Sequence, residues 1–214
     1  MRLTAVRRAQ IDPFDPDRPP AAYDLTERGR VQARLLGARL ARENPPDAVY
    51  TGDSDRHRDT AAVVAGTVEA ITGDRPPVET DAGLDDVAWT MDALLTCHED
   101  GLPQVEWSRR WAAGDLPIEE DVTAVRDRVC ALADRLADDR DPDASLLVVT
   151  SAVPIQVLAS AALGIDLATA RLPVANAARF AFDWAADRRT VEALNDAAHL
   201  PGALATRDGF VDRD

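Results

Sequence analysis

The segment that most constrains the fold is SLLVVTSAVPIQVLASAALG at 145–164. Its four consecutive apolar residues at 146–149 are typical of a strand buried on both faces of a parallel sheet. The residues that follow have the length and apolar content of a helix, which ends at Gly164. A strand leading into a helix that packs back on the sheet is the repeating unit of α/β proteins. We therefore predict an α/β fold with a mostly parallel central sheet.

Strand and helix patterns of the same kind occur on both sides of this segment. Apolar or alternating runs predict strands at 2–6, at 47–52, weakly within 78–90, at 178–184 and at 190–196, and amphipathic spacing predicts helices at 25–44, 59–71 and 119–139. This order predicts a three-layer sandwich with helices on both faces of the sheet. Ligands bind such sheets at the carboxyl ends of the strands. The polar residues that follow each strand are therefore the candidates for a site.

The chain is expected to be a single domain spanning 1–214. Its 214 residues and 46% apolar content suffice for one ordinary hydrophobic core. Residues 87–118 contain Trp107 and Trp111 but lack strong helical or strand periodicity. We interpret this region as a small helical lid inserted into the domain.

Charge and cysteine usage limit the expected partners. The formal charge of −14 at pH 7 repels nucleic acid and anionic membrane surfaces, so neither is expected as a partner. Without a signal-like start or an apolar stretch near the ~20 residues of a membrane helix, a cytoplasmic protein is expected. Cys97 and Cys130 fit no disulfide framework and no metal motif, so no cofactor is expected. Whether the chain forms a homodimer stays open.

Arginine and serine side chains follow three of the expected strands. Arg7 and Arg8 follow the first strand, Arg56 lies in the loop after the second, and Ser151 follows the strand at 146–149. Arginine suits the recognition of anions, because its planar guanidinium donates two parallel hydrogen bonds to a phosphate or carboxylate. Position alone nevertheless favours solvated surface arginines for Arg7 and Arg8, so an anion site at this edge depends on further motifs in the chain.

With these motifs the chain resembles the histidine phosphatase superfamily, which has the phosphoglycerate-mutase-like fold. LTERGRVQA at 25–33 matches the family's LTxxGxxQA without change, and VYTGDSDRHRDTA at 49–61 matches its S-x-x-x-R-x-x-x-T-A around Arg56. LPIEEDVTAVRDRV at 116–129 and ALNDAAHL at 193–200 also resemble family segments, so the resemblance spans roughly residues 2–200. The resemblance implies that Arg7 and Arg56 grip a phosphate and that Asp86 lies at the general-acid position.

The chain departs from the family at the reacting residues. In the family, the histidine of Arg-His-Gly attacks phosphorus, and here that position is Arg8. A guanidinium has no free lone pair and cannot accept a phosphoryl group in this way. The family's second histidine, in Ser-His-Gly, is replaced by Ser151, and the two glycines that follow these histidines are replaced by Ala9 and Ala152. The resemblance thus implies a degenerate member that lacks both catalytic histidines.

Our leading hypothesis is that the inherited pocket binds an anionic small molecule. Arg7, Arg8 and Arg56 would hold its phosphate or carboxylate, and Ser151 would donate a hydrogen bond to it. The protein would then be a pseudophosphatase, or an enzyme of altered reaction type in which Arg8, Ser151 and Asp86 take part and Asp86 moves a proton. Arg8 pointing out of the pocket is an open alternative.

Two residues offer alternative chemistry. His57 is a candidate ligand-binding residue and a substitute nucleophile for an active phosphomonoester hydrolase. Neighbouring residues at a helix start point in different directions, so we expect His57 to face away from Arg56. Ser151 lacks the G-x-S-x-G elbow of serine hydrolases and an apparent base partner, which favours hydrogen bonding over nucleophilic attack. A structural or partner-binding subunit is the remaining alternative.

Overall fold

The computed structural model describes residues 1–13, 15, 17–18, 23–185 and 187–206. Within these residues one sheet has the strand order β3-β2-β4-β1-β5-β6. Its strands are β1 (Arg2–Arg7), β2 (Ala48–Thr51), β3 (Val78–Thr80), β4 (Ser145–Thr150), β5 (Arg179–Trp184) and β6 (Arg189–Asp196). The first four strands pair in parallel, whereas β5 and β6 pair antiparallel to their neighbours. The prediction of a mostly parallel sheet is confirmed.

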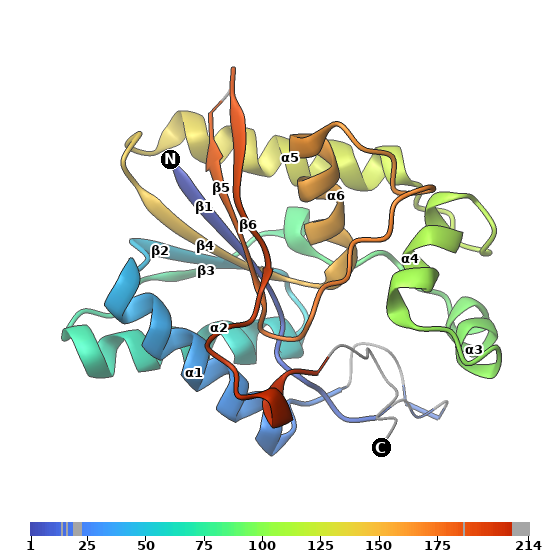
Figure 1. Ribbon diagram of the computed structural model, residues 1–214, viewed down its shortest axis with the longest axis horizontal. Helices are drawn as coiled ribbons and strands as arrows, with labels where there is room; N and C mark the ends of the chain where they lie inside the picture. Colours follow the sequence, from blue (N-terminus) through green and yellow to red (C-terminus); the bar gives the residue numbers. More distant parts are fainter. Residues whose placement is uncertain (14, 16, 19–22, 186, 207–214) are drawn as a thin grey trace.

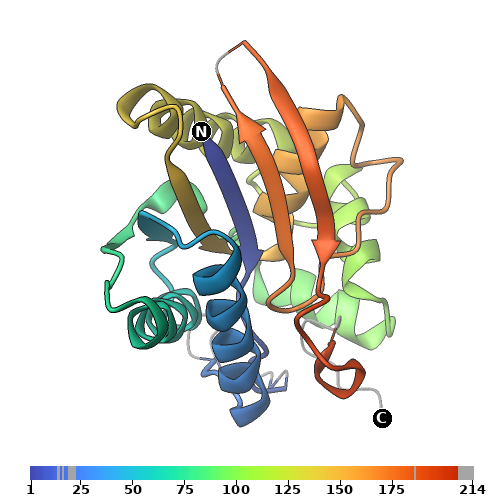
Figure 2. The ribbon, with the colours of Figure 1, turned by 60° about the vertical axis from the view of Figure 1, so that its left-hand side comes forward.

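Helices lie on both faces of this sheet (Figure 1). They are α1 (Glu27–Glu43), α2 (Asp55–Thr72), α3 (Met91–Glu99), α4 (Gln104–Ala112), α5 (Val122–Asp139) and α6 (Ala152–Leu163). Leu146 and Val148 of β4 belong to the core cluster that includes α5 and α6. Leu147 and Val149 belong to the cluster that includes α1 and α2. The continuous apolar run of β4 therefore fills both cores, as its composition predicts, and the three-layer α/β sandwich is confirmed (Figure 2).

Local signals explain where the first helix begins and ends. Thr26 is the N-cap of α1, and its hydroxyl accepts a hydrogen bond from the Gly29 amide at 3.0 Å. Pro45 and Pro46 follow the C-cap residue Asn44 and prevent the helix from continuing.

The second helix begins earlier than the sequence pattern predicts. We expected a helix at 59–71, but α2 begins at Asp55 and Ser54 is its N-cap residue. The polar residues that precede position 59 are typical of a loop, but serine and aspartate also suit a helix N-terminus. The difference places Arg56 and His57 in the first helical turn, where both side chains are buried.

Residues 87–118 contain the two short helices α3 and α4, which lie on the right-hand side of the molecule in Figure 1. Trp107 and Trp111 anchor this region in the same core as α5 and α6. The two helices agree with the expected helical character of residues 87–118. That this region moves as a lid stays a prediction. Among the described residues, no helix combines the length and the apolar character needed to cross a membrane.

Candidate functional site

The two central strands bring the first candidate residues together. Arg7, the last residue of β1, pairs in register with Thr150, the last residue of β4. The Arg8 amide donates to the Thr150 carbonyl at 2.7 Å, so Arg8 lies beside the residue that precedes Ser151. Gly52 follows β2 at the same edge and donates to the Val149 carbonyl. The parallel pairing thus places three strand ends at one site.

The backbone after β1 is held by three side chains from other elements. The Ala9 amide donates to Thr60 Oγ1 at 3.1 Å, and the Gln10 amide donates to Gln32 Oε1 at 2.8 Å. Asn176 Nδ2 donates to the Arg8 carbonyl at 3.3 Å. We did not predict these positioning residues. Gln32 and Thr60 do lie in the two segments that resemble the family, which was the available signal.

Three arginine side chains converge beside these strand ends. Arg7, Arg8 and Arg56 are buried, and Arg8 is only 5% exposed. The pKa of Arg8 lies well below its ordinary value because of its burial and the charges of Arg7 and Arg56, which Asp86 offsets in part. Arg8 therefore points into the cluster, and the alternative in which it points outward is wrong. This edge of the sheet therefore brings three guanidiniums together, with Asp86 beside them.

His57 also belongs to this cluster, contrary to our expectation that it faces away. Its side chain is fully buried, and Nε2 lies 2.9 Å from Ser151 Oγ. Gly52 explains the difference, because a Cβ there would lie 2.7 Å from His57 Nδ1. Burial first, then Arg56 and Arg8, lower the pKa of His57 well below its ordinary value. The imidazole is therefore neutral at pH 7, and its Nδ1 has no hydrogen-bond partner among the described residues.

Ser151 occupies the N-cap position of α6 without capping that helix. Its side chain accepts no hydrogen bond from the first helical turn, and its Oγ lies against His57 instead. Ser151 is 4% exposed, whereas His57 is 0% exposed. Our statement that Ser151 lacks a base partner is therefore wrong, since the partner lies 94 residues earlier in the chain.

Asp86 lies at the arginine cluster in a constrained position. Its Oδ1 accepts from the Val87 amide at 2.9 Å and from Trp89 Nε1 at 3.3 Å. Its Oδ2 lies 3.5 Å from Arg56 Nη2. Asp86 therefore pairs with Arg56 and offsets part of the cluster's positive charge.

A clamp from α5 fixes the loop that carries Asp86. Arg128 donates to the carbonyls of Gly83, Asp85 and Asp86, and its Nε pairs with Glu120 at 2.7 Å. We did not predict this clamp. Both residues lie in the family-like stretch at 116–129, but only the fold shows that they act on a distant loop.

Two further observations bear on thiol and metal chemistry in the described residues. Burial raises the pKa of the Cys97 thiol to about 11, which leaves little thiolate at neutral pH. No group of three His, Cys, Asp or Glu side chains in the described part of the chain is arranged to hold a metal ion.

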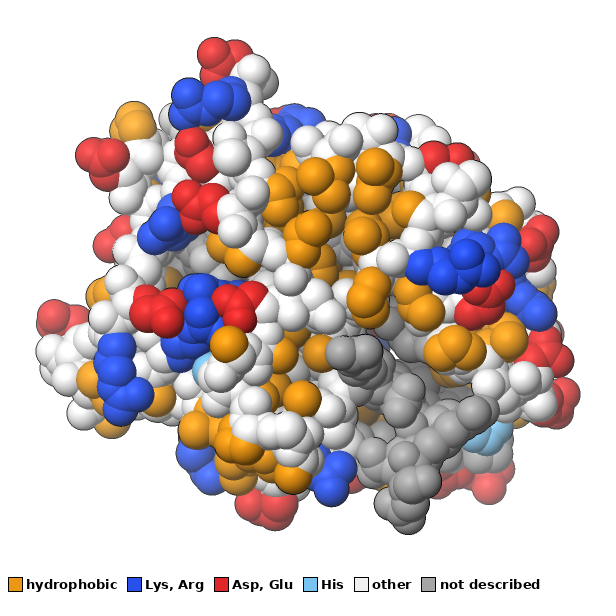
Figure 3. Space-filling model, in the orientation of Figure 1, with side chains coloured by type: hydrophobic (Ala, Val, Ile, Leu, Met, Phe, Trp, Pro, Cys, Tyr) orange, Lys and Arg blue, Asp and Glu red, His pale blue; other side chains and the backbone are white. Residues whose placement is uncertain are grey.

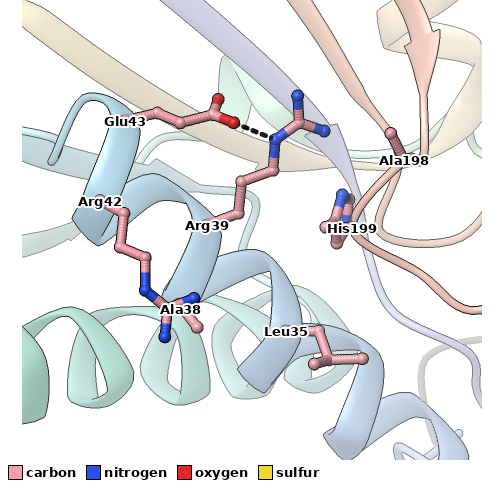
Figure 4. A pocket seen from close by; sticks show the side chains of 7 residues that line it. All are labelled: Leu35, Ala38, Arg39, Arg42, Glu43, Ala198 and His199. Carbon is pink, nitrogen blue, oxygen red and sulfur yellow. Dashed lines mark hydrogen bonds and ion pairs between the residues drawn. The ribbon is translucent and has the colours of Figure 1, made fainter.

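A separate pocket of about 390 Å³ lies between α1 and the residues after β6 (Figure 4). It is lined by Leu35, Ala38, Arg39, Arg42, Glu43, Ala198 and His199. Arg39 is already paired with Glu43 and Asp196, so its charge is compensated within the protein. None of the predicted site residues lines this pocket.

Comparison with known proteins identifies the family to which the chain is similar. The model of the histidine phosphatase superfamily, branch 1, matches residues 19–197. Phosphoserine phosphatase 1 of Hydrogenobacter thermophilus is 30% identical over 150 residues, which is 67% of this chain and 66% of the relative. The alignment thus spans just under two thirds of that relative's length.

Solved structures share the fold at lower identity. YhfR of Bacillus stearothermophilus has a TM-score of 0.71 and 20% identity, covering 92% of this chain and 98% of that chain. A phosphoglycerate mutase of Bacillus anthracis has a TM-score of 0.69 and 20% identity, with coverage of 92% and 94%. A mycobacterial glucosyl-3-phosphoglycerate phosphatase, solved with inorganic phosphate, has a TM-score of 0.67 and 21% identity, with coverage of 94% and 99%. Given the family match over most of its length, this chain belongs to the histidine phosphatase superfamily.

Proposed function

We propose that this protein binds a phosphate-bearing small molecule at Arg7, Arg8 and Arg56 and forms no phosphohistidine at position 8. The observation that carries the proposal is the inward, buried guanidinium of Arg8, which lies where the resemblance assigns the attacking histidine. A guanidinium donates hydrogen bonds to phosphate but has no lone pair with which to attack phosphorus. In this proposal the site still binds the anion, but the attack of a histidine at position 8 on phosphorus is lost.

Electrostatics support an anionic ligand of small size. A phosphate dianion among three buried guanidiniums offsets their mutual repulsion and replaces lost hydration with charge-assisted hydrogen bonds. A nucleic acid is a poorer candidate, because the whole chain carries a formal charge of −14. On the face drawn in Figure 3, basic side chains are interspersed with acidic ones. The printed names of the relatives, a phosphoserine phosphatase and a phosphoglycerate mutase, agree with a phosphate ester as the ligand class.

Direct attack by His57, which we considered as a substitute for the missing histidine, is disfavoured by its position. The ring is fully buried, and its Nε2 faces Ser151. The Nε2 atom of His57 is therefore already in contact with Ser151. In our proposal Ser151 faces the ligand, and Asp86 orients Arg56.

Thermal unfolding with inorganic phosphate tests the binding proposal. A ligand that binds only the native state stabilises it by about 2.7 kcal/mol at one hundred times its Kd, so phosphate is expected to raise the Tm of the wild type. Arg56→Met is expected to reduce this shift. Arg75→Met is the matched control, because Arg75 lies on the exposed surface in a pair with Glu69. No shift in the wild type, or an equal shift in Arg56→Met, would contradict the proposal and favour a structural subunit.

A further inference from the structure

We propose that Ser151 is a nucleophile with His57 as its general base, and that the site transfers a phosphoryl group through a phosphoserine intermediate. The proposal rests on the proposed function in one respect, since the phosphoryl group must bind at the arginine cluster. It differs from the family's covalent histidine, because the atom that attacks phosphorus is Ser151 Oγ.

The geometry assigns the two roles. His57 Nε2 and Ser151 Oγ are 2.9 Å apart, within the range of a hydroxyl and the base that deprotonates it. Both residues are buried, at 0% exposure for His57 and 4% for Ser151, and Ser151 precedes α6 directly. In the proposed reaction the serine oxygen attacks the substrate, and the histidine accepts the serine proton.

The absence of a capping bond leaves the serine oxygen available. Serine at an N-cap position ordinarily accepts a hydrogen bond from the helix backbone, but Ser151 does not. The first amides of a helix have no partner within the helix, and Pro154 in the first turn of α6 has no amide to satisfy. Negative charge on the transferring phosphoryl group is stabilised at such a helix N-terminus.

Charge at the cluster makes the base depend on the ligand. In the free protein, Arg56 and Arg8 oppose a positive charge on His57. Burial is the larger cause of the lowered His57 pKa, and a bound phosphate dianion offsets the contribution of the two arginines, which favours transfer of the serine proton when the substrate is in place. Arg8 cannot attack phosphorus. Like Arg7 and Arg56, it donates hydrogen bonds to the oxygens of the transferring phosphoryl group in this proposal.

The reaction balances with water as the only co-reactant. Ser151 Oγ attacks phosphorus, its proton passes to His57 Nε2, the bond from phosphorus to the ester oxygen breaks, and the departing oxygen takes a proton from solvent. Water then attacks the phosphoserine and loses a proton to solvent. The bond from Oγ to phosphorus breaks, Oγ recovers its proton from His57, and inorganic phosphate leaves.

Rapid-quench experiments with p-nitrophenyl phosphate test the proposal. The wild type is expected to release nitrophenolate and to show, after acid quench, a peptide carrying one phosphoryl group on Ser151. Phosphoserine survives acid whereas phosphohistidine does not, so the stability of the adduct distinguishes the two nucleophiles. Ser151→Ala is expected to lose both adduct and turnover. His57→Gln, which keeps a hydrogen-bonding side chain without a base, is expected to lower kcat about 100- to 10,000-fold.

Matched controls separate this proposal from the binding proposal. Ser160→Ala is the control, because Ser160 is a buried serine of the same helix whose hydroxyl bonds to the Val157 carbonyl, and its turnover is expected to be unchanged. Phosphate should still raise the Tm of Ser151→Ala. This rise would show that the variant folds and binds phosphate although it does not turn over substrate. A phosphate shift in the wild type with no turnover and no adduct overturns the serine proposal alone. Turnover without an acid-stable adduct on Ser151, or turnover that survives in Ser151→Ala, also overturns it. If phosphate does not raise the Tm of the wild type, the binding proposal is overturned.

Discussion

Gly52 decides the orientation of His57. It is positioned by a backbone hydrogen bond to β4, and its missing side chain leaves room for the imidazole. A Cβ at this position would also lie 2.8 Å from the Leu84 carbonyl oxygen, a backbone atom that cannot move aside cheaply. The inward direction of His57 therefore depends on a residue that carries no chemistry itself.

Gly52→Ala is expected to displace His57 and to destabilise the protein by about 1–3 kcal/mol, because an added methyl group overpacks a closed site. Gly66→Ala in α2 is the control. A Cβ there meets only the flexible end of Arg75 at 3.5 Å, and alanine in a helix interior is expected to stabilise by about 0.5–1 kcal/mol. Urea unfolding measures both changes, and histidine ring NMR reports the loss of the Ser151 contact. An unshifted His57 resonance in Gly52→Ala would contradict this account.

Arg8 is expected to reduce the stability of the protein without ligand. Burial and two neighbouring cations disfavour its charge, and an apolar side chain at this position would not carry the cost of burying that charge. Arg8→Met should therefore raise the Tm in phosphate-free buffer and reduce the further rise that phosphate produces. Calorimetry with and without phosphate measures the two effects. A lower Tm in both conditions would mean that Arg8 stabilises the fold.

At the scale of elements, the site depends on how α5 holds the loop before α3. Arg128 reaches three backbone carbonyls of residues 83–86, which carry Asp86. Thr150 adds a hydrogen bond from the end of β4 to the Leu84 carbonyl. Helix, strand and loop therefore set the position of one carboxylate together.

Arg128→Met is expected to cost about 2–3 kcal/mol, because it removes charged hydrogen bonds to three partly buried carbonyls. Arg135→Met is the matched control two turns further along the same helix. Arg135 pairs with Asp81 but is 53% exposed, so its loss is expected to cost less than about 1 kcal/mol. Denaturant unfolding of both variants compares them. Equal costs would show that the clamp contributes no more than a surface ion pair.

At the scale of the whole molecule, two histidines shape the response to acid. The pKa of His57 is held well below 6.5, and burial lowers the pKa of His199 to about 4. Below pH 6.5 the unfolded chain binds protons at these positions while the folded chain does not. Stability therefore falls as the pH falls from 6.5 toward 4, with a limiting slope of about 1.4 kcal/mol per pH unit for each such proton.

His57→Gln is expected to flatten this dependence. The variant loses one proton-binding group in the unfolded state, so the slope of unfolding free energy against pH between 6 and 4.5 should decrease by up to about 1.4 kcal/mol per pH unit. Chemical denaturation across that range measures the slope. An unchanged slope would mean that His57 binds a proton in the folded protein as readily as in the unfolded one.

The sequence by itself determined the fold class and most of the element order. Hydrophobic periodicity is local, so the strand at 146–149, the helix that follows it and the Thr26 cap were readable from neighbouring residues. The matched segments around Arg56 and at 25–33 also located the arginine cluster. The start of α2 was missed, because polar residues suit both a loop and a helix N-terminus.

Only the tertiary structure decided which way the site residues point. His57 and Ser151 are 94 residues apart, and their contact requires both the parallel pairing at β4 and the open space at Gly52. Arg128 likewise acts on a loop more than 40 residues away. The direction of a side chain depends on contacts with residues that are far away in the sequence. Hydrophobic periodicity is local and carries no information about those contacts. For this reason the sequence identified the charges of the site, whereas the pairing of its histidine and serine emerged only from the folded chain.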